Sequence, residues 1–298
     1  MNALVATLGI LGVSASGPLI SGTLAGTTVG ALAIAFWRNA IAAVVMGGPE
    51  VVRRPQSFAQ LGRRALGYSA LAGFSLALHF VCFIYSLSLT SVAASTALVC
   101  LQSGWIAIIQ LFRGARHSWH VLVGLGISFL GVVAITGFDL GTSPHALWGD
   151  ILAILGGVLA GVYTLAGSKA RESMTTGAYT GICYGICAAA VLVMAVASGQ
   201  PLLGFSFNGW LGIVAITVAA QLLGHTSLNH LVGHLSALVV STLVLLEIPG
   251  AAILAVVFLD QVPPAGTYLG LALILVGLVV VIVGQRGDRT PLLEAQID

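Results

Sequence analysis

The chain has 298 residues, of which 58% are hydrophobic and only 7% are charged, and its mean hydropathy is +1.06. Soluble domains carry about 25% charged residues, so this composition excludes an ordinary water-soluble fold and predicts an all-α protein embedded in lipid. The formal net charge of +2 is too small to indicate a nucleic-acid partner. The 38 glycines are typical of membrane helices that pack closely.

Ten stretches are long and apolar enough to cross a bilayer, whose core of about 30 Å needs roughly 20 apolar residues per helix. They are 3–21, 28–46, 65–87, 91–112, 119–137, 149–168, 178–198, 208–229, 236–258 and 266–284. The first stretch has no preceding Lys or Arg, so we interpret it as a retained helix and not as a signal peptide. The short connections predict antiparallel neighbouring helices and leave no room for a soluble domain.

The basic residues give an independent test of this count, because cytoplasmic loops carry an excess of Lys and Arg. With the N-terminus in the cytoplasm, alternate connections should be basic. Ten of the 11 Lys and Arg residues fall on that side: Arg53, Arg54, Arg63, Arg64, Arg113, Arg116, Lys169, Arg171, Arg286 and Arg289. The opposite connections contain none, and only Arg38 lies within a span. The pattern predicts ten spans with both termini cytoplasmic.

A shift of 146 residues aligns the chain with itself, which indicates an internal repeat. The aligned pairs include polar and apolar positions: Gly124 with Gly270, Gly131 with Gly277, Gly104 with Gly250, His79 with His225, and Ser95-Thr96 with Ser241-Thr242. Gly-rich apolar helices also resemble one another by composition alone, which is the alternative. Two halves of five spans would be inverted relative to each other. The predicted units are 1–138 and 147–286, followed by a short cytoplasmic tail, 287–298.

Several residues carry a resemblance to a known family. Arg38 stands in the segment FWRNAIAA of the second span. Pro249 precedes an apolar stretch that ends at Asp260, and Gly270 and Gly277 follow in the last span. With the tandem five-helix halves, these features resemble the ten-helix EamA-type branch of the drug/metabolite transporter superfamily over essentially the whole chain. Within that branch, the chain is most similar to bacterial exporters of aromatic and other amino acids.

The first half departs from the family pattern. Ser103 stands where the proline is expected, and Gly114 stands where the acidic residue is expected. The resemblance therefore does not imply that the two halves act equivalently.

Few polar side chains lie inside the predicted spans, where a charge costs at least ~2.5–3.5 kcal/mol. Glu247, midway along span nine, is a candidate to bind a substrate ammonium group or carry a proton; the alternative is a structural carboxylate bonded to a neighbouring helix. Pro249 removes a backbone donor and predicts a helix bend beside it. His79 and His225 are candidates for proton exchange or for binding a carboxylate, and each is alternatively a structural histidine.

The resemblance implies a central cavity lined by the first, third and fourth spans of each half. The further cavity candidates on those spans are Tyr85, Gln102, Trp105, Tyr163 and Thr242. An aromatic wall would suit apolar or cationic side chains, and ordinary packing is the alternative. Arg38 is a candidate to recognise a carboxylate bidentately, but a structural role is favoured, since the resemblance places it in a scaffold helix. Cys183 and Cys187 are interpreted as apolar filler.

The apolar spans predict a multi-pass membrane protein. The resemblance implies that it lies in the cell (inner) plasma membrane and exports amino acids or related small metabolites by alternating access. No phosphate-binding loop is present, so no cofactor or metal is expected. The expected partners are a small-molecule substrate and the lipid bilayer, with a monomer as the working unit. The alternatives are another cargo, such as a drug or nucleotide sugar, and an integral-membrane enzyme. His230 and His234 lack the glutamate of a zinc-enzyme motif, and the chain is not expected to be an enzyme.

Overall fold

The fold is entirely helical over the residues that this computed structural model describes, which are 2–59, 61–114, 118–263 and 265–287. The side chains of 2, 59, 136–142, 278, 282 and 285–287 are not described. The predictions that concern Arg116, Arg286, Arg289 and the tail 287–298 therefore lie wholly or partly outside the described structure.

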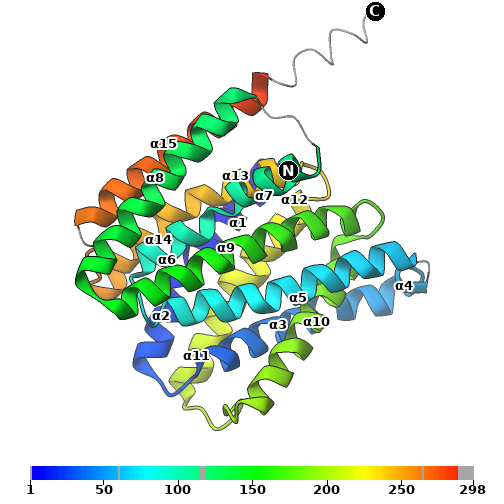
Figure 1. The fold of residues 1–298 in the computed structure, drawn as a ribbon. Coiled ribbons are helices and arrows are strands. Elements are labelled where there is room, and N and C mark those ends of the chain that lie inside the picture. Colours follow the sequence, from blue (N-terminus) through cyan, green and yellow to red (C-terminus); the bar gives the residue numbers. More distant parts are fainter. Residues whose placement is uncertain (1, 60, 115–117, 264, 288–298) are drawn as a thin grey trace, which may run out of the picture.

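The helices follow one another with short connections (Figure 1). In chain order they are α1 (Asn2–Ser14), α2 (Ser16–Gly26), α3 (Ala31–Arg53), α4 (Gln56–Ala59), α5 (Arg63–Ser86), α6 (Val92–Cys100), α7 (Gln102–Phe112), α8 (Trp119–Thr142), α9 (Pro144–Arg171), α10 (Thr176–Ala197), α11 (Phe207–Ile216), a π-helix (Thr217–His225), α12 (Thr226–Leu231), α13 (Ala237–Leu243), a 3₁₀ turn (Val244–Leu246), α14 (Glu247–Leu259) and α15 (Ala265–Gly287).

Eight helical runs within the described residues are long and apolar enough to cross a membrane: Ala3–Gly26, Ala31–Arg53, Arg63–Ser86, Val92–Phe112, Pro144–Arg171, Thr176–Ala197, Phe207–Leu231 and Ala237–Leu259. The other two predicted spans fall on α8 and α15, whose described apolar stretches, Trp119–Ile135 and Ala265–Val281, are shorter. The prediction of an all-helical, multi-pass membrane protein is confirmed, and the count of ten remains a prediction.

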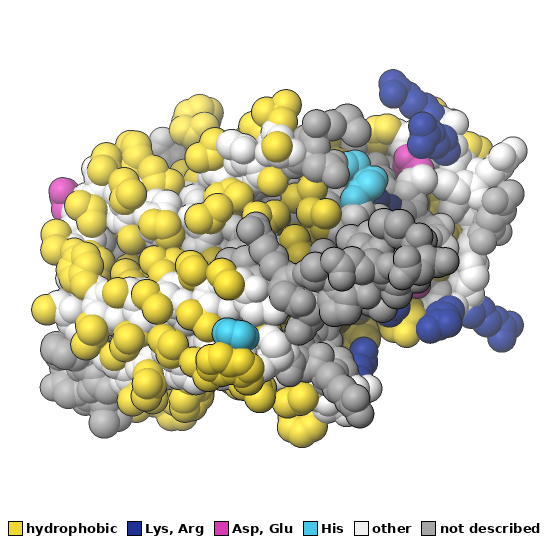
Figure 2. Space-filling view, turned by 90° about the horizontal axis from the view of Figure 1, so that it is seen from above, with side chains coloured by type: hydrophobic (Ala, Val, Ile, Leu, Met, Phe, Trp, Pro, Cys, Tyr) yellow, Lys and Arg dark blue, Asp and Glu magenta, His cyan; other side chains and the backbone are white. Residues whose placement is uncertain are grey.

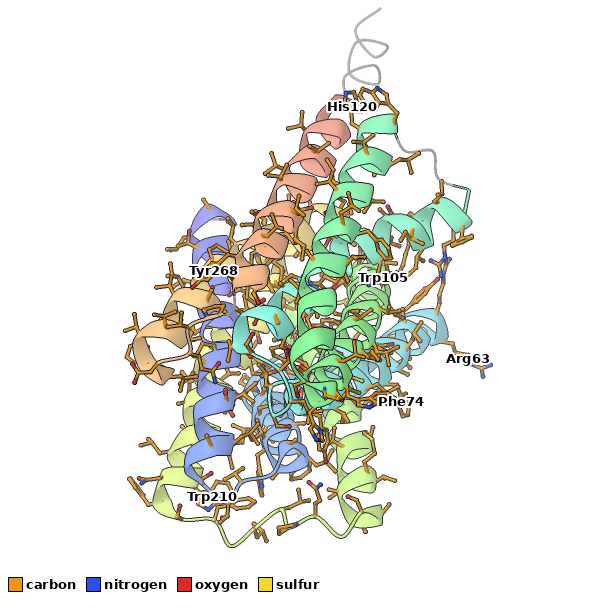
Figure 3. All side chains as sticks on the ribbon, turned by 60° about the vertical axis from the view of Figure 1, so that its left-hand side comes forward. Arg63, Phe74, Trp105, His120, Trp210 and Tyr268 are labelled. Carbon is orange, nitrogen blue, oxygen red and sulfur yellow. The ribbon has the colours of Figure 1, made fainter. Side chains whose placement is uncertain are left out.

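The surface agrees with a lipid environment. Large apolar side chains point outward along the bundle, among them Phe74 at 57% and Tyr268 at 51% exposure (Figure 3). The face seen in Figure 2 is mostly hydrophobic, and its Lys and Arg side chains gather at one end of the molecule. Because a soluble protein rarely exposes apolar patches this extensive, this surface belongs in hydrocarbon.

Four runs are interrupted within the bundle. The first changes from α1 to α2 at Ala15, and the fourth changes from α6 to α7 at Leu101. The seventh contains the π-helix, and the eighth contains the 3₁₀ turn between α13 and α14. Irregular backbone at membrane depth is tolerated where protein surrounds it or where it lines a cavity. These interruptions therefore indicate segments that are surrounded by protein or that line a cavity within the bundle.

Close glycine contacts hold α8 against α15, which lie side by side in Figure 1. A Cβ atom on Gly131 would lie 2.7 Å from the carbonyl oxygen of Gly270, and one on Gly124 would lie 2.8 Å from the amide nitrogen of Val281. Gly277 meets the Gly124 carbonyl in the same way. Carbon atoms pack best at ~3.5–4.0 Å, so only glycine permits this approach.

The glycine contacts between α8 and α15 are also consistent with the 146-residue shift found in the sequence. The shift relates Gly124 to Gly270 and Gly131 to Gly277, whereas the contacts join Gly124 to Gly277 and Gly131 to Gly270. Exchanging the two halves therefore converts one contact into the other. Two further contacts join positions that the shift relates directly: the Ser128 hydroxyl donates to the Ile274 carbonyl at 3.4 Å, and the rings of His79 and His225 lie 6.4 Å apart.

We expect Gly131→Leu to destabilise the protein by about 1–3 kcal/mol, because the added side chain overpacks the α8–α15 interface. Thermal unfolding of the detergent-purified protein measures the change. Gly126→Leu is the matched control, since a Cβ on Gly126, on the same helix, meets nothing within 4 Å. Equal losses in the two variants would contradict the assignment of this interface.

Candidate functional site

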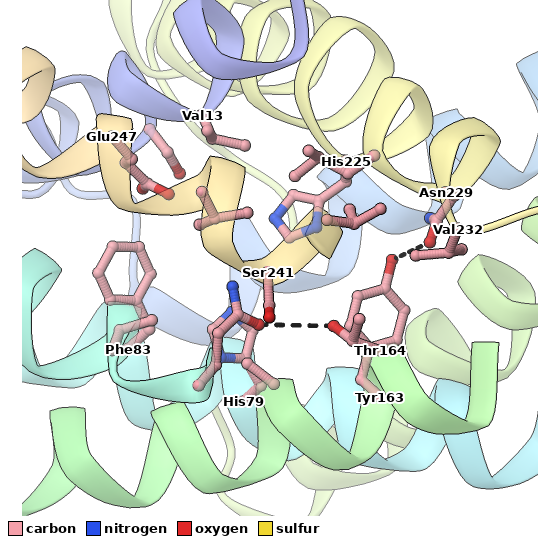
Figure 4. Close-up of a pocket in the computed structure, with 17 residues that line it drawn as sticks. Val13, His79, Phe83, Tyr163, Thr164, His225, Asn229, Val232, Ser241 and Glu247 are labelled. Atoms are coloured by element: carbon pink, nitrogen blue, oxygen red, sulfur yellow. Dashed lines mark hydrogen bonds between the residues drawn. The ribbon is translucent and has the colours of Figure 1, made fainter. Parts of the chain in front are cut away.

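A polar cavity lies at the centre of the bundle (Figure 4). The space open to water centres is about 50 Å³, which is room for a few water molecules. Its walls come from α1, α2, α5, α6, α7, α9, the π-helix, α12, α13, the 3₁₀ turn and α14. The lining residues are Val13, Ser16, His79, Phe83, Val99, Gln102, Ala160, Tyr163, Thr164, His225, Leu228, Asn229, Val232, Val240, Ser241, Val244 and Glu247.

Five of the residues predicted from sequence meet here. His79, Gln102, Tyr163, His225 and Glu247 all line the cavity, although they come from five different helical elements. The prediction concerned substrate contact, which remains a proposal; what the structure adds is that one cavity contains all five.

His79 is held in a defined orientation. Its Nδ1–H donates to the carbonyl oxygen of Gly156 on α9 at 2.9 Å, and its ring stacks on Phe83 with centroids 6.0 Å apart. With the proton on Nδ1, a neutral imidazole has Nε2 as an acceptor. His225 faces it from the π-helix, with its ring 6.2 Å from that of Tyr163. The two histidines therefore place ring nitrogens on opposite walls of the same space.

Asn229 ties three helices together beside the cavity. Its side-chain oxygen accepts from the Tyr163 hydroxyl at 2.7 Å, and its amide nitrogen donates to the Tyr184 hydroxyl at 2.9 Å. Its backbone carbonyl accepts from the Arg171 guanidinium at 3.2 Å. Through these bonds α12 is held to α9 and α10. We call Asn229, Tyr163 and Tyr184 the Asn229 clamp.

Glu247 begins α14, where the run Ala237–Leu259 resumes after the 3₁₀ turn. Pro249 has no amide hydrogen to give the carbonyl of residue 245, which accounts for the interruption just before it. The Cys100 thiol donates to the carbonyl of Val244 at 3.7 Å, and the same carbonyl accepts from the backbone N–H of Glu247. Among the described residues, no side chain or backbone group forms a hydrogen bond with the Glu247 carboxylate, which is 8% exposed and borders the cavity.

Arg38 lies behind the cavity wall in the scaffold. It is fully buried, its Nε donates to the Gln221 side-chain oxygen at 2.8 Å, and its guanidinium carbon lies 4.1 Å above the centre of the Phe80 ring. Gln221 in turn donates to the side-chain oxygen of Asn39 at 3.1 Å. The two terminal nitrogens of the Arg38 guanidinium have no hydrogen-bond partner within the described part of the chain. Arg38 is absent from the cavity lining, as the sequence interpretation expected.

Three predicted residues lie elsewhere. The Tyr85 hydroxyl accepts from Gln200 at 2.8 Å near the ends of α5 and α10. Trp105, half-buried on α7, packs against Gly161 of α9, and Thr242 bonds back to the carbonyl of Leu238 within α13. Each of the three residues lies on a helix that contributes other residues to the cavity wall. The rotation of a helix about its own axis decides which of its side chains reach the cavity, and the sequence of an apolar span gives little indication of that rotation.

Sequence reasoning missed Asn229, Thr164 and Phe83 as cavity residues. Asn229 follows His225 by one helical turn, so a polar residue at i+4 from a candidate was an available signal. Thr164 donates to the Gln102 side-chain oxygen at 3.5 Å across the cavity wall (Figure 4). Phe83 follows His79 at the same spacing, but an aromatic residue in an apolar span carries no such signal.

No group of three or more His, Cys, Asp or Glu side chains suited to a metal occurs within 2–59, 61–114, 118–263 and 265–287. His230 and His234 are neighbours, with ring centroids 4.5 Å apart. Cys183 and Cys187 are buried free thiols on α10.

Comparison with known proteins found one family match and similar solved structures. Residues 147–283 match the EamA-like transporter family. No curated protein matches the chain. A solved structure, described only as "Crystal structure of protein", is similar with a TM-score of 0.68 and 18% identity, covering 96% of this chain and 98% of that chain. At that identity the likeness shows a common fold, and the family match indicates a membrane transporter of small solutes.

Replacing Asn229 with Leu should destabilise the protein by about 1–3 kcal/mol, because the buried Tyr163 hydroxyl loses its acceptor. Asn208→Leu, an exposed asparagine on α11, is the control and should change stability by less than about 0.5 kcal/mol. Chemical or thermal unfolding in detergent compares the two. An unchanged Asn229→Leu protein would mean that the Asn229 clamp does not hold α9, α10 and α12 together.

Proposed function

We propose that the whole chain is a member of the EamA-type branch of the drug/metabolite transporter superfamily and exports amino acids or related small metabolites across the cell (inner) membrane. The solute would bind in the central cavity, which would open alternately to each side. The resemblance of the chain to bacterial amino-acid exporters and the family match of residues 147–283 support this proposal.

The observation that carries the proposal is the Glu247 carboxylate. It borders a cavity inside an apolar bundle, and no described residue forms a hydrogen bond with it. An intramembrane carboxylate without a protein partner is costly unless a cation, proton or water satisfies it. The ammonium group of an amino acid is such a cation. The Tyr163 and Phe83 rings and the Gln102 amide supply the apolar and polar contacts that the rest of an amino acid needs.

The arrangement of the helices supports an inverted repeat of ten spans with units 1–138 and 147–286. The paired glycine contacts of α8 and α15, and the contacts His79–His225 and Ser128–Ile274, are those expected beside a pseudo-two-fold axis between the halves. In transporters of this design, the substrate site lies at the interface of the repeats. The cavity wall contains both His79 and His225, which the shift relates, and this supports the cavity as the binding site.

The orientation proposed is with both termini in the cytoplasm. Arg53 ends α3, Arg63 begins α5, and Lys169 and Arg171 end α9. The Lys and Arg side chains gathered at one end in Figure 2 support this assignment, because that end would face the cytoplasm.

The charge of the cavity argues against a nucleotide-sugar cargo. Among the described residues that line it, none is Lys or Arg, and Arg38 lies behind the wall with its Nε bonded to Gln221 and its guanidinium over Phe80. A diphosphate needs cationic or multiple N–H donors, whereas this cavity presents a carboxylate. Cationic or zwitterionic solutes therefore fit better.

Purified protein in proteoliposomes should show saturable counterflow of labelled amino acids. A panel of aromatic, aliphatic and cationic amino acids, measured with and without a pH gradient, identifies the cargo and any proton coupling. Glu247→Gln should reduce transport at least tenfold, because the neutral amide cannot pair with an ammonium group or carry a proton. Glu172→Gln is the control, since that carboxylate is exposed and pairs only with Lys169 among the described residues.

Absence of counterflow across the panel, in protein shown to be folded, would overturn the amino-acid assignment. Full transport by Glu247→Gln would remove Glu247 from the proposed binding site while leaving the transporter assignment intact.

A further inference from the structure

A second hollow lies on the side of the bundle, between α5, α7 and α9. It contains about 320 Å³ of empty space, counting the part open to its surroundings. It shares no lining residue with the central cavity, and α9 separates the two. We call this hollow the lateral groove; its lining residues are Tyr68, Leu71, Ile109, Arg113, Val162, Leu165, Ala166 and Lys169.

Helical spacing explains the lateral groove. The four α9 residues follow one another at i, i+3, i+4 and i+7, so they form one continuous face of that helix. Tyr68 and Leu71 lie one turn apart on α5, and Arg113, which directly follows α7, lies four residues after Ile109. Ala166, which is 3% exposed, is the smallest of these side chains and leaves the space open.

The groove is apolar along its length and cationic at one end. Arg113 directly follows α7, and Lys169 lies in the last turn of α9, so both belong to the end of the bundle that is rich in basic residues. The Arg64 guanidinium lies 5.8 Å from the Tyr68 ring centre, which adds a third positive charge beside the same end. Leu71, at 46% exposure, faces outward on the apolar wall.

One carboxylate lies nearby. Glu172 accepts from Lys169 at 2.7 Å, and these side chains are 49% and 60% exposed. Exposed ion pairs contribute little, so a second anion can share Lys169 without a large loss. Within the described residues this is the only ion pair, and Arg113 has no carboxylate within salt-bridge distance there.

We propose that the lateral groove binds an anionic phospholipid, with the headgroup phosphate at Arg113 and Lys169 and one acyl chain along the apolar walls. An anionic phospholipid has a charged headgroup at one end and an apolar acyl chain that extends from it. The groove has the matching arrangement, with cations only at the end of the bundle and a long apolar wall beyond them. A free phosphate ion would gain nothing from Leu71, Ile109 and Leu165. This inference does not depend on the identity of the transported solute.

Lipid titration of the purified full chain, followed by native mass spectrometry, tests the proposal. The wild type should bind phosphatidylglycerol more tightly than phosphatidylcholine. Arg113→Gln with Lys169→Gln should weaken phosphatidylglycerol binding by about 30-fold, at about fivefold for each charge near the surface. Phosphatidylcholine binding should stay unchanged, and excess inorganic phosphate should not displace the lipid.

The matched control removes the same charge at the same end of the bundle. Arg53→Gln with Arg54→Gln changes two exposed arginines at the end of α3 that do not line the groove, and it should preserve the preference. Arg113→Lys with Lys169→Arg keeps both charges and should also preserve it, with size-exclusion profiles showing that every variant is folded. Equal wild-type affinity for the two lipids, equal loss in the control pair, or displacement by inorganic phosphate would each overturn the proposal.

Discussion

Inside a lipid bilayer a polar group has no water to bond with, so each one must find a partner within the protein or border a water-filled space. Several buried polar side chains meet this constraint at least in part. Arg38 bonds to Gln221 and lies over Phe80, and Asn229 bonds to Tyr163 and Tyr184. Glu247 is the buried carboxylate that borders the cavity instead. Its position follows from the same physics, since a carboxylate in the packed part of the bundle would be far more costly.

The constraint also explains where the helices are irregular. Within a regular helix the backbone N–H and C=O groups bond to one another. For this reason α9 can continue without interruption beside the cavity. The π-helix and the 3₁₀ turn leave some backbone carbonyls without their usual helical partners. Each of the two segments contributes a residue to the cavity wall, His225 and Val244. The Thr226 hydroxyl donates to the Gln221 carbonyl, and the Cys100 thiol donates to Val244. Single-turn π segments are frequent at functional sites in general.

Packing without a hydrophobic driving force depends on close approach. Lipid tails are as apolar as Leu, so helices associate through van der Waals contact, and glycine permits the closest contact. At the α8–α15 interface this requirement produces paired contacts that the 146-residue shift interchanges. The same requirement brings Gly12 of α1 within a hypothetical Cβ distance of 2.7 Å from the Gly224 nitrogen of the π-helix. Close backbone contact thus positions the element that carries Gln221 and His225.

The sequence by itself determined the environment, the class of fold and much of the candidate site. Hydrophobic length does not depend on neighbours, so most ends of the apolar runs were located to within a few residues; the largest extension is at the C-terminus of α3, which ends at Arg53 where the predicted span ends at residue 46. Five residues chosen from those runs line one cavity, which agrees with the cost of placing polar groups in lipid; their contact with a substrate stays a prediction. A helix bend was expected beside Pro249, and the 3₁₀ turn Val244–Leu246 lies just before that residue, because a missing backbone donor is a local property.

Only the tertiary structure decided which faces meet. Tyr85, Trp105 and Thr242 lie on helices that border the cavity, yet their side chains point elsewhere, and Asn229 turns inward instead. In a soluble helix the polar face marks the outside, but a lipid-facing surface and a protein-facing surface are both apolar, so periodicity does not distinguish them. Neither the break at Leu101 nor the π-helix has a proline that would mark it in the sequence. The lateral groove is of the same kind, since three helices that are individually ordinary create it only by packing together.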